Sequence, residues 1–219
     1  MEKASIIIAA GGKGTRMGRP KQMLSLNGKT VLERSIETFK KLSSAAEIIV
    51  VADTDTFKRI NGKFKSLKHA LPGQTRLQSV INGVAAANPK YKFVAIHDGA
   101  RPLVKTEDIQ NCLNAAIRNK AAVLAVAVKD TIKEVKNGFI VNTSDRTKLW
   151  AAQTPQCYET QTLKEALKKY GKLKNATDES QLVEKLGVKV AVVPSSYGNI
   201  KITTPEDLIM ANALCKRKK

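Results

Sequence analysis

Aromatic residues are scarce in this chain of 219 residues, and cysteine and histidine are scarcer still. Only 5% of the residues are aromatic although 42% are hydrophobic, so the core must consist mainly of aliphatic side chains. The three cysteines, Cys112, Cys157 and Cys215, lie far apart without CxxC spacing, which argues against a disulfide framework or a zinc site. The two histidines, His69 and His97, are too few to complete a metal cluster with them. A cytoplasmic location is therefore the default expectation.

Long hydrophobic runs are missing as well. No apolar stretch reaches the roughly 18 residues that a membrane helix requires, so no membrane partner is expected. The apolar stretch near the N-terminus ends in a Gly-rich basic loop without a cleavage pattern, which favours a buried first strand over a signal peptide. The length, without a linker or an internal repeat, predicts a single domain over residues 1–219.

Acidic residues are few, and the formal net charge is +19. Such a surface attracts polyanions, either a nucleic acid or a nucleotide together with a phosphorylated substrate. The excess charge is dispersed in lysine pairs and a basic tail, and the chain shows no basic stripe with interleaved aromatics and no nucleic-acid module. A basic nucleic-acid-binding protein is therefore only a distant alternative, and no nucleic acid is expected as a partner.

The chain does contain a regular alternation of strand-like and helix-like segments. Short unbroken apolar runs are typical of strands buried on both faces, and they occur at residues 6–10, 48–52, 93–96, 122–128 and 188–193. Helical spacing follows at residues 31–42 and 77–84, and Thr204-Pro205 predicts another helix start. The pattern predicts an α/β fold with a Rossmann-like, twisted and mostly parallel sheet flanked by helices.

One segment interrupts this alternation. Residues 130–148 contain Asn137-Gly138 between two extended runs, which is a strong signal for a two-residue hairpin. An isolated two-stranded ribbon is only marginally stable in water. We therefore expect a protruding β-hairpin arm that packs either on a second copy of the chain or back on its own domain.

The first candidate site is the Gly-rich loop after the first strand, Ala-Ala-Gly-Gly-Lys-Gly-Thr-Arg-Met at residues 9–17, followed by Pro20-Lys21. Glycines allow the backbone N–H groups to approach phosphate oxygens, and Arg16 and Lys21 add cationic donors. The loop lacks the Gly-Lys-Ser/Thr ending of a Walker loop, and Met17 occupies the last glycine position of the dinucleotide fingerprint. It fits the sugar-nucleotide type of loop at nearly every position.

The second candidate site is His-Asp-Gly-Ala-Arg-Pro at residues 97–102, after a buried strand. Ligands of open parallel sheets bind beyond the carboxyl ends of the strands, and Asp98 there suits a ribose hydroxyl or a metal ion on a triphosphate. For His97 we favour a packed, hydrogen-bonded histidine. Further candidate segments follow at residues 73–80, 149–156, 176–179 and 199–207.

These segments, in this order, resemble those of the 2-C-methyl-D-erythritol 4-phosphate cytidylyltransferase family from about Ser5 to Leu208. The resemblance implies transfer of a cytidylyl group from CTP to a sugar-alcohol phosphate with Mg²⁺, release of pyrophosphate and no covalent enzyme intermediate. It also implies a homodimer, in which the arm of one subunit reaches the site of its neighbour.

The resemblance assigns roles to individual residues. The implied catalytic residues are Arg16, Lys21 and Lys201. The implied nucleotide-binding residues are Ala9, Ala10, Gly11, Gly12, Gly14, Gly73, Ser79, Asp98 and Ala100, with Asp98 also near the metal. The implied substrate-binding residues are Arg101, Thr131, Arg146, Thr154 and Thr177, of which Thr131 and Arg146 would come from the neighbouring arm.

The chain departs from the family pattern in two places. The spacer between Arg16 and Lys21 is short, as in molybdenum-cofactor nucleotidyltransferases, which do not combine the segments at residues 97–102 and 153–156. Gln74 and Thr75 stand where a glycine and an acid are frequent. A ribitol-5-phosphate cytidylyltransferase is the nearest alternative, although residues 145–150 look more like the methylerythritol enzyme.

Overall fold

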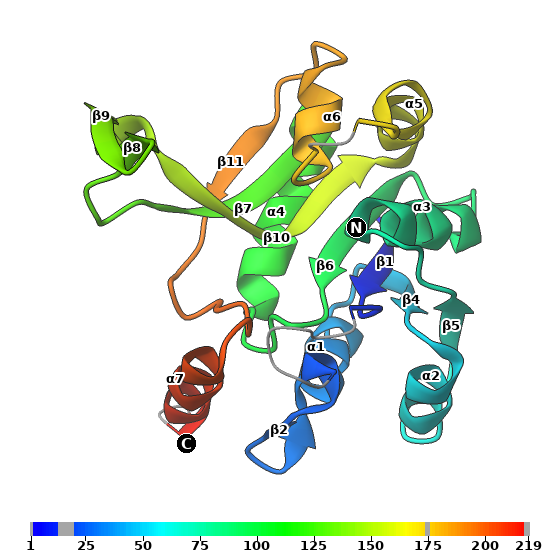
Figure 1. Cartoon of the computed structure of the whole chain (residues 1–219). Coiled ribbons are helices and arrows are strands. Elements are labelled where there is room, and N and C mark those ends of the chain that lie inside the picture. Colours follow the sequence, from blue (N-terminus) through cyan, green and yellow to red (C-terminus); the bar gives the residue numbers. More distant parts are fainter. Residues whose placement is uncertain (1, 13–19, 174–175, 217–219) are drawn as a thin grey trace.

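The centre of the molecule is a seven-stranded sheet (Figure 1). The computed structural model describes residues 2–12, 20–173 and 176–216. In sheet order the strands are β11 (Ala191–Pro194), β7 (Ala121–Ala127), β10 (Trp150–Glu159), β6 (Phe93–Asp98), β1 (Ala4–Ala9), β4 (Ala45–Val51) and β5 (Leu67–Ala70). Strand β10 runs antiparallel to β6 and β7, whereas every other pair in this sheet is parallel. The predicted fold class is confirmed.

Helices cover both faces of the sheet, as the apolar runs require. In β1, Ile6 and Ile8 pack in one cluster and Ile7 in the other, because successive side chains of a strand point to opposite faces. The first cluster is closed by α1 (Val31–Lys40), α2 (Thr54–Asn61) and α4 (Thr106–Asn119). The second is closed by α3 (Arg76–Ala86), α5 (Thr160–Tyr170) and α6 (Ser180–Glu184).

A smaller third cluster lies beside the sheet. It joins the C-terminal helix α7 (Pro205–Lys216) to the short hairpin of β2 (Ser25–Leu26) and β3 (Lys29–Thr30), which follows the turn η2 (Lys21–Met23). Ile202 and Leu103 pack between them, so the segment before α7 is held against the loop after β6. Among the described residues, none of the helices combines the length and the apolar character that a bilayer crossing requires.

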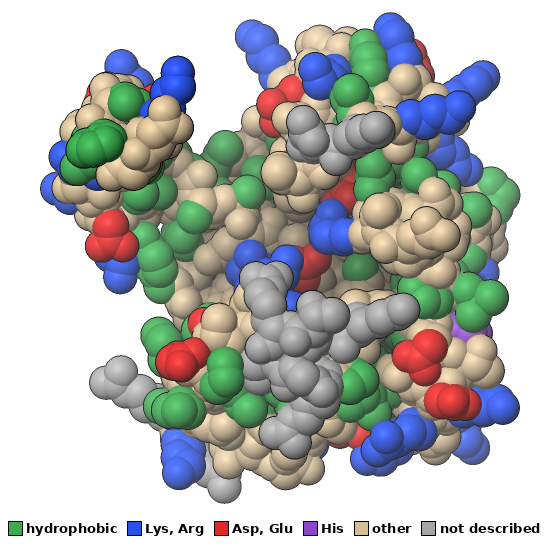
Figure 2. Space-filling view, viewed as in Figure 1, with side chains coloured by type: hydrophobic (Ala, Val, Ile, Leu, Met, Phe, Trp, Pro, Cys, Tyr) green, Lys and Arg blue, Asp and Glu red, His purple; other side chains and the backbone are tan. Residues whose placement is uncertain are grey.

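The arm is a separate two-stranded ribbon of β8 (Lys133–Lys136) and β9 (Phe139–Thr143), followed by the turn η3 (Arg146–Lys148). Asn137 and Gly138 have φ of 51° and 83°, the positive values that a type I′ hairpin turn requires. Figure 1 shows the ribbon standing away from the body, and Figure 2 shows hydrophobic side chains on it. Phe139 is 76% exposed and Ile140 63%. The arm predicted from Asn137-Gly138 is therefore present and carries uncovered apolar surface.

The strand predictions were right for β1, β4, β6 and β7. The helical spacing correctly identified α1 and α3, and the start signal at Thr204-Pro205 correctly identified α7. The prediction of a strand over residues 188–193 was wrong in its bounds, because pairing with β7 begins only at Ala191. Two strands of the central sheet were not predicted, nor were the short strands β2 and β3. Strand β5 is a short edge strand with only four residues, and β10 carries polar residues that hid its strand character.

Candidate functional site

A cavity of about 510 Å³ lies beyond the carboxyl ends of β1 and β6, which end side by side at Ala9 and Asp98. This volume is in the range of small-molecule sites. The cavity brings together the described residues expected to bind the nucleotide, namely Ala9, Ala10, Gly11, Gly12, Gly73, Ser79, Asp98 and Ala100. Two of the expected catalytic residues, Lys21 and Lys201, line it as well. It also includes Gln22, Gln74, Thr75 and Arg76. We call it the nucleotide cavity.

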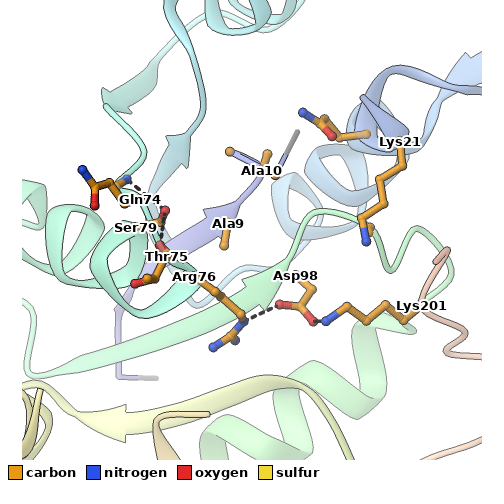
Figure 3. A pocket seen from close by; sticks show the side chains of 14 residues that line it. Ala9, Ala10, Lys21, Gln74, Thr75, Arg76, Ser79, Asp98 and Lys201 are labelled. Carbon is orange, nitrogen blue, oxygen red and sulfur yellow. Dashed lines mark hydrogen bonds and ion pairs between the residues drawn. The ribbon is translucent and has the colours of Figure 1, made fainter. Parts of the chain in front are cut away.

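Asp98 is the electrostatic centre of this region (Figure 3). Its Oδ1 accepts a hydrogen bond from Arg76 Nε at 3.0 Å, and its Oδ2 pairs with Lys201 Nζ at 2.7 Å. Arg101 Nε lies 3.8 Å from the same Oδ2. Burial alone would raise the pKa of Asp98, but the charges of Arg76, Lys201 and Arg101 outweigh it and hold the pKa well below its usual range. Asp98 is therefore a carboxylate at all ordinary pH values.

A second cavity, of about 200 Å³, lies on the other side of Asp98. It brings together the residues expected to hold the acceptor in the same chain, which are Arg101, Thr154, Thr177 and Lys201. Gln153, Gln156 and Asp178 complete much of its wall. Arg76, Asp98 and Lys201 border both cavities and so form a shared wall between them. We call this second space the acceptor cavity.

Thr154 and Arg101 are held in place by the buried His97. Thr154 Oγ1 accepts from the Asp98 N–H at 3.0 Å and lies 3.1 Å from His97 Nδ1. The other ring nitrogen, Nε2, lies 3.1 Å from the Arg101 carbonyl oxygen, an acceptor that requires this nitrogen to carry the proton. Burial lowers the pKa of His97 to about 4, so its ring is neutral. The expectation of a packed, hydrogen-bonded histidine is confirmed.

The segment at residues 73–80 forms the wall of the nucleotide cavity that lies across from Lys21 (Figure 3). Thr75 caps α3 by accepting from the Gln78 N–H at 3.0 Å. Ser79 Oγ accepts from the Gly73 N–H at 3.0 Å and donates to the Thr75 carbonyl oxygen at 2.9 Å, so it fixes the loop. Any Cβ on Gly73 would overlap Gln78, and a Cβ on Gly11 would overlap Pro72. These close approaches explain glycine at both positions.

Sequence reasoning missed Arg76 and its second partner, Glu179. Arg76 Nη1 donates to Glu179 Oε1 at 2.6 Å, and the Glu179 side chain is fully buried. Burial raises the pKa of Glu179, and the charge of Arg76 opposes this only in part. The sequence did hold one clue. Arg76 is in the first turn of α3, where a cation opposes the helix dipole and therefore needs another reason to be there.

Two of the expected site residues that the structure describes do not line these cavities. Thr131 and Arg146 are exposed at the base of the arm, and Arg146 Nη1 donates to the Lys129 carbonyl oxygen at 2.7 Å. Arg16 and Gly14 lie outside the described residues. Described residues of the body of the chain thus line both cavities, whereas Thr131 and Arg146 of the arm line neither.

The described residues contain no group of three or more His, Cys, Asp or Glu side chains arranged to hold a metal ion. Asp98 is the one carboxylate among the described residues that line the nucleotide cavity. Such a donor set fits Mg²⁺ only when substrate phosphates supply most of the remaining ligands, which is the usual way in which nucleotide-dependent enzymes hold this ion.

Comparisons with known proteins agree with this arrangement. The profile of the 2-C-methyl-D-erythritol 4-phosphate cytidylyltransferase family matches residues 4–217. The enzyme of that name from Caldanaerobacter subterraneus subsp. tengcongensis is 42% identical over 97% of this chain and 99% of its own length. The chloroplastic enzyme of Oryza sativa subsp. japonica is 41% identical over 98% of this chain and 75% of its own length. The crystal structure of 4-diphosphocytidyl-2C-methyl-D-erythritol synthase from Anaerococcus prevotii superposes with a TM-score of 0.87, at 34% identity over 99% of each chain.

Proposed function

This chain belongs to the 2-C-methyl-D-erythritol 4-phosphate cytidylyltransferase family, and we propose that its two cavities carry out that reaction on CTP and 2-C-methyl-D-erythritol 4-phosphate. A phosphate oxygen of the acceptor would form a bond to the α-phosphorus of CTP. The bond from that phosphorus to the bridging oxygen would break, and pyrophosphate would leave with the electron pair. The product would be 4-diphosphocytidyl-2-C-methyl-D-erythritol, an intermediate of non-mevalonate isoprenoid biosynthesis.

The observation that carries this proposal is the shared wall. Arg76, Asp98 and Lys201 border both cavities, so a nucleotide in one and an acceptor in the other would meet there. In-line phosphoryl chemistry needs the two reactants held in position and their charge stabilised, and it needs no protein nucleophile. The described part of the chain offers cations and backbone N–H groups at this place, in accordance with that requirement.

Figure 3 shows Lys21 and Lys201 on the same side of the nucleotide cavity, across from Gln74, Thr75 and Ser79. We assign to Lys21, with Arg16 from the Gly-rich loop, the stabilisation of the charge that builds up on the α-phosphoryl group. We assign to Lys201 the positioning of the acceptor phosphate, because it borders the acceptor cavity and is anchored on Asp98 at 2.7 Å. Gly12, beside which a Cβ would meet no described atom within 4 Å, leaves room for the triphosphate.

Mg²⁺ is the proposed cofactor, and Asp98 is the protein group that would contact it. When bound, the ion would neutralise charge on the triphosphate and orient it. The chain's own residues still have to place the two substrates, and the ion pairs of Asp98 with Arg76 and Lys201 fix this carboxylate at the shared wall.

A homodimer through the arm is proposed for the same reaction. Val135, Phe139, Ile140 and Val141 are all at least 60% exposed on the arm, and a two-stranded ribbon needs a partner for stability. Thr131 and Arg146 lie at its base. Placed over the acceptor cavity of a second chain, they would complete the site for the acceptor phosphate. A cytoplasmic location is proposed as well, which fractionation of the source cells would test.

The reaction itself is tested by pyrophosphate release with CTP and Mg²⁺, in parallel with 2-C-methyl-D-erythritol 4-phosphate and with ribitol 5-phosphate. We expect turnover with the first acceptor and none with the second. Turnover only with ribitol 5-phosphate would keep the chemistry and overturn the acceptor. Absence of release with both would overturn the proposed function.

The shared dimer site is tested by mixing two inactive variants, Arg146→Ala and Lys21→Ala. Each variant alone lacks one part of both sites, whereas a mixed dimer carries one complete site. After unfolding and refolding together, the mixture should recover about a quarter of the native activity, because half of the dimers are mixed and each has one intact site. Recovery of none would show that Arg146 does not act across subunits.

A further inference from the structure

Arg76 is the single residue, among the described residues lining these spaces, that borders three cavities at once. Two are the nucleotide and acceptor cavities. The third, of about 290 Å³, lies between the start of α3 and the segment before α6. Whatever fixes the Arg76 guanidinium therefore fixes a surface that both substrates share.

The guanidinium is fixed by two carboxylates from distant parts of the chain. Arg76 Nε binds Asp98 at 3.0 Å and Arg76 Nη1 binds Glu179 at 2.6 Å. Asp98 in turn pairs with Lys201, so four charges alternate in sign from Glu179 through Arg76 and Asp98 to Lys201. The outer end, Glu179, is fully buried and is absent from the linings of the nucleotide and acceptor cavities. Its ion pair with Arg76 connects it to the wall that the two cavities share.

The burial of Glu179 also lowers the free energy of unfolding. Its Oε2 is buried and has no hydrogen-bond partner among the described residues. A charged group in such a position costs stability unless it is fully paired, so a purely structural role would be met better by an apolar side chain. In metal sites, carboxylates are kept in such positions because they orient the ligands that they contact. Glu179 stands in the same relation to Arg76.

We propose that Glu179 is a positioning residue for cytidylyl transfer, which holds Arg76 against Asp98 and thereby sets Asp98 and Lys201 at the wall between the two substrates. The inference rests on the proposed function. Arg76 is well suited to this task, because its planar guanidinium binds two carboxylates in fixed directions, which a lysine cannot do.

The test is a double-mutant cycle with Glu179→Gln and Arg76→Met, in which kcat and both KM values are measured with the full-length chain. Glutamine keeps the shape and removes the charge. In the native background we expect Glu179→Gln to lower kcat about 10- to 100-fold, the usual effect of removing a supporting partner behind a ligand. In the Arg76→Met background the same change should alter kcat less than about threefold, because the residue through which it acts is gone.

Glu47→Gln is the matched control. Glu47 is a half-buried carboxylate whose ion pair, to Lys68, has the same length of 2.6 Å, and it lies near the amino end of β4, away from the cavities. It should lose thermal stability while kcat stays within about twofold of the native value. If Glu179→Gln fails to fold, Arg76→Lys replaces it. Lysine keeps the positive charge but cannot bind Asp98 and Glu179 together, so this variant should show the same loss of kcat.

Two outcomes would overturn the proposal. One is a native-like kcat in folded Glu179→Gln or, failing that variant, in Arg76→Lys. The other is an equal fold-loss of kcat on changing Glu179 in both backgrounds, which would mean that it does not act through Arg76. The unaltered chain is assayed in the same series. Absence of turnover there would overturn the proposed function, whereas turnover there with an insensitive Glu179→Gln overturns only the positioning role.

Discussion

Gly11 and Gly12 are neighbours in the nucleotide cavity, yet an added methyl group should have opposite effects on them. At Gly11 a Cβ would overlap Pro72 Cβ and would lie 3.1 Å from its Cγ. The proline ring is rigid, so it would have to move by roughly 1 Å to reach ordinary contact distance. Overpacking of this kind costs about 1–3 kcal/mol of unfolding free energy. At Gly12 a Cβ meets no described atom within 4 Å.

Gly12→Ala should therefore gain stability, by about 0.4–1 kcal/mol, because alanine restricts the unfolded chain. With an m-value of about 2 kcal/mol per molar urea, the unfolding midpoints of Gly11→Ala and Gly12→Ala should differ by roughly 1 M. Urea titration of both variants without CTP measures this. KM for CTP should still rise in Gly12→Ala, since the new methyl enters the cavity. Equal midpoints for the two variants would refute the packing argument at Pro72.

Three further results are expected. Lys21→Ala and Lys201→Ala should fold normally and lose about 10²- to 10³-fold in kcat, the usual effect of removing a preorganised charge donor, as pyrophosphate release would measure. Asp98→Asn should lose about 2 kcal/mol of stability near neutral pH, where its three cations lose their counter-charge. Because the pKa of Asp98 is lowered on folding, this advantage of the native chain is present above about pH 4 and should shrink in urea titrations at lower pH. The NMR signals of the His97 ring should stay unchanged between about pH 6 and pH 8, since burial lowers its pKa to about 4.

The sheet was predictable where strands are buried on both faces. The run Ile6-Ile7-Ile8 has no polar position, and all three side chains are fully buried. Strand β10 was not predictable in this way, because Gln153, Thr154 and Gln156 are polar and buried. Their burial depends on partners elsewhere in the chain, as when Gln156 Nε2 donates to Asp178 at 2.8 Å and Gln156 Oε1 accepts from Tyr158 at 2.7 Å. Periodicity carries no information about such partners.

The residues that line the two cavities were predictable for a different reason. They follow the carboxyl ends of strands, and in a parallel sheet these ends share one edge. Their places in the sequence, after predicted strands, therefore indicate that they lie close together. The bond between Arg76 and Glu179 was not predictable, because 103 residues separate its ends. Ion pairs of that kind depend on the exact approach of α6 to α3, which is set by packing in the second core cluster.

The nucleotide side and the acceptor side of the site are supported in different ways. Gly11, Gly12 and Asp98 lie at the ends of strands whose burial fixes them, so their positions depend on the core. Lys201 belongs to a segment held through Ile202, which packs with α7 and donates its backbone N–H to the Ala100 carbonyl oxygen at 2.9 Å. The acceptor side therefore depends on contacts among loops, and the ion pairs around Asp98 are the links that tie those loops to the sheet. A substitution that loosens α7 should consequently affect the acceptor more than CTP, although α7 itself borders neither cavity.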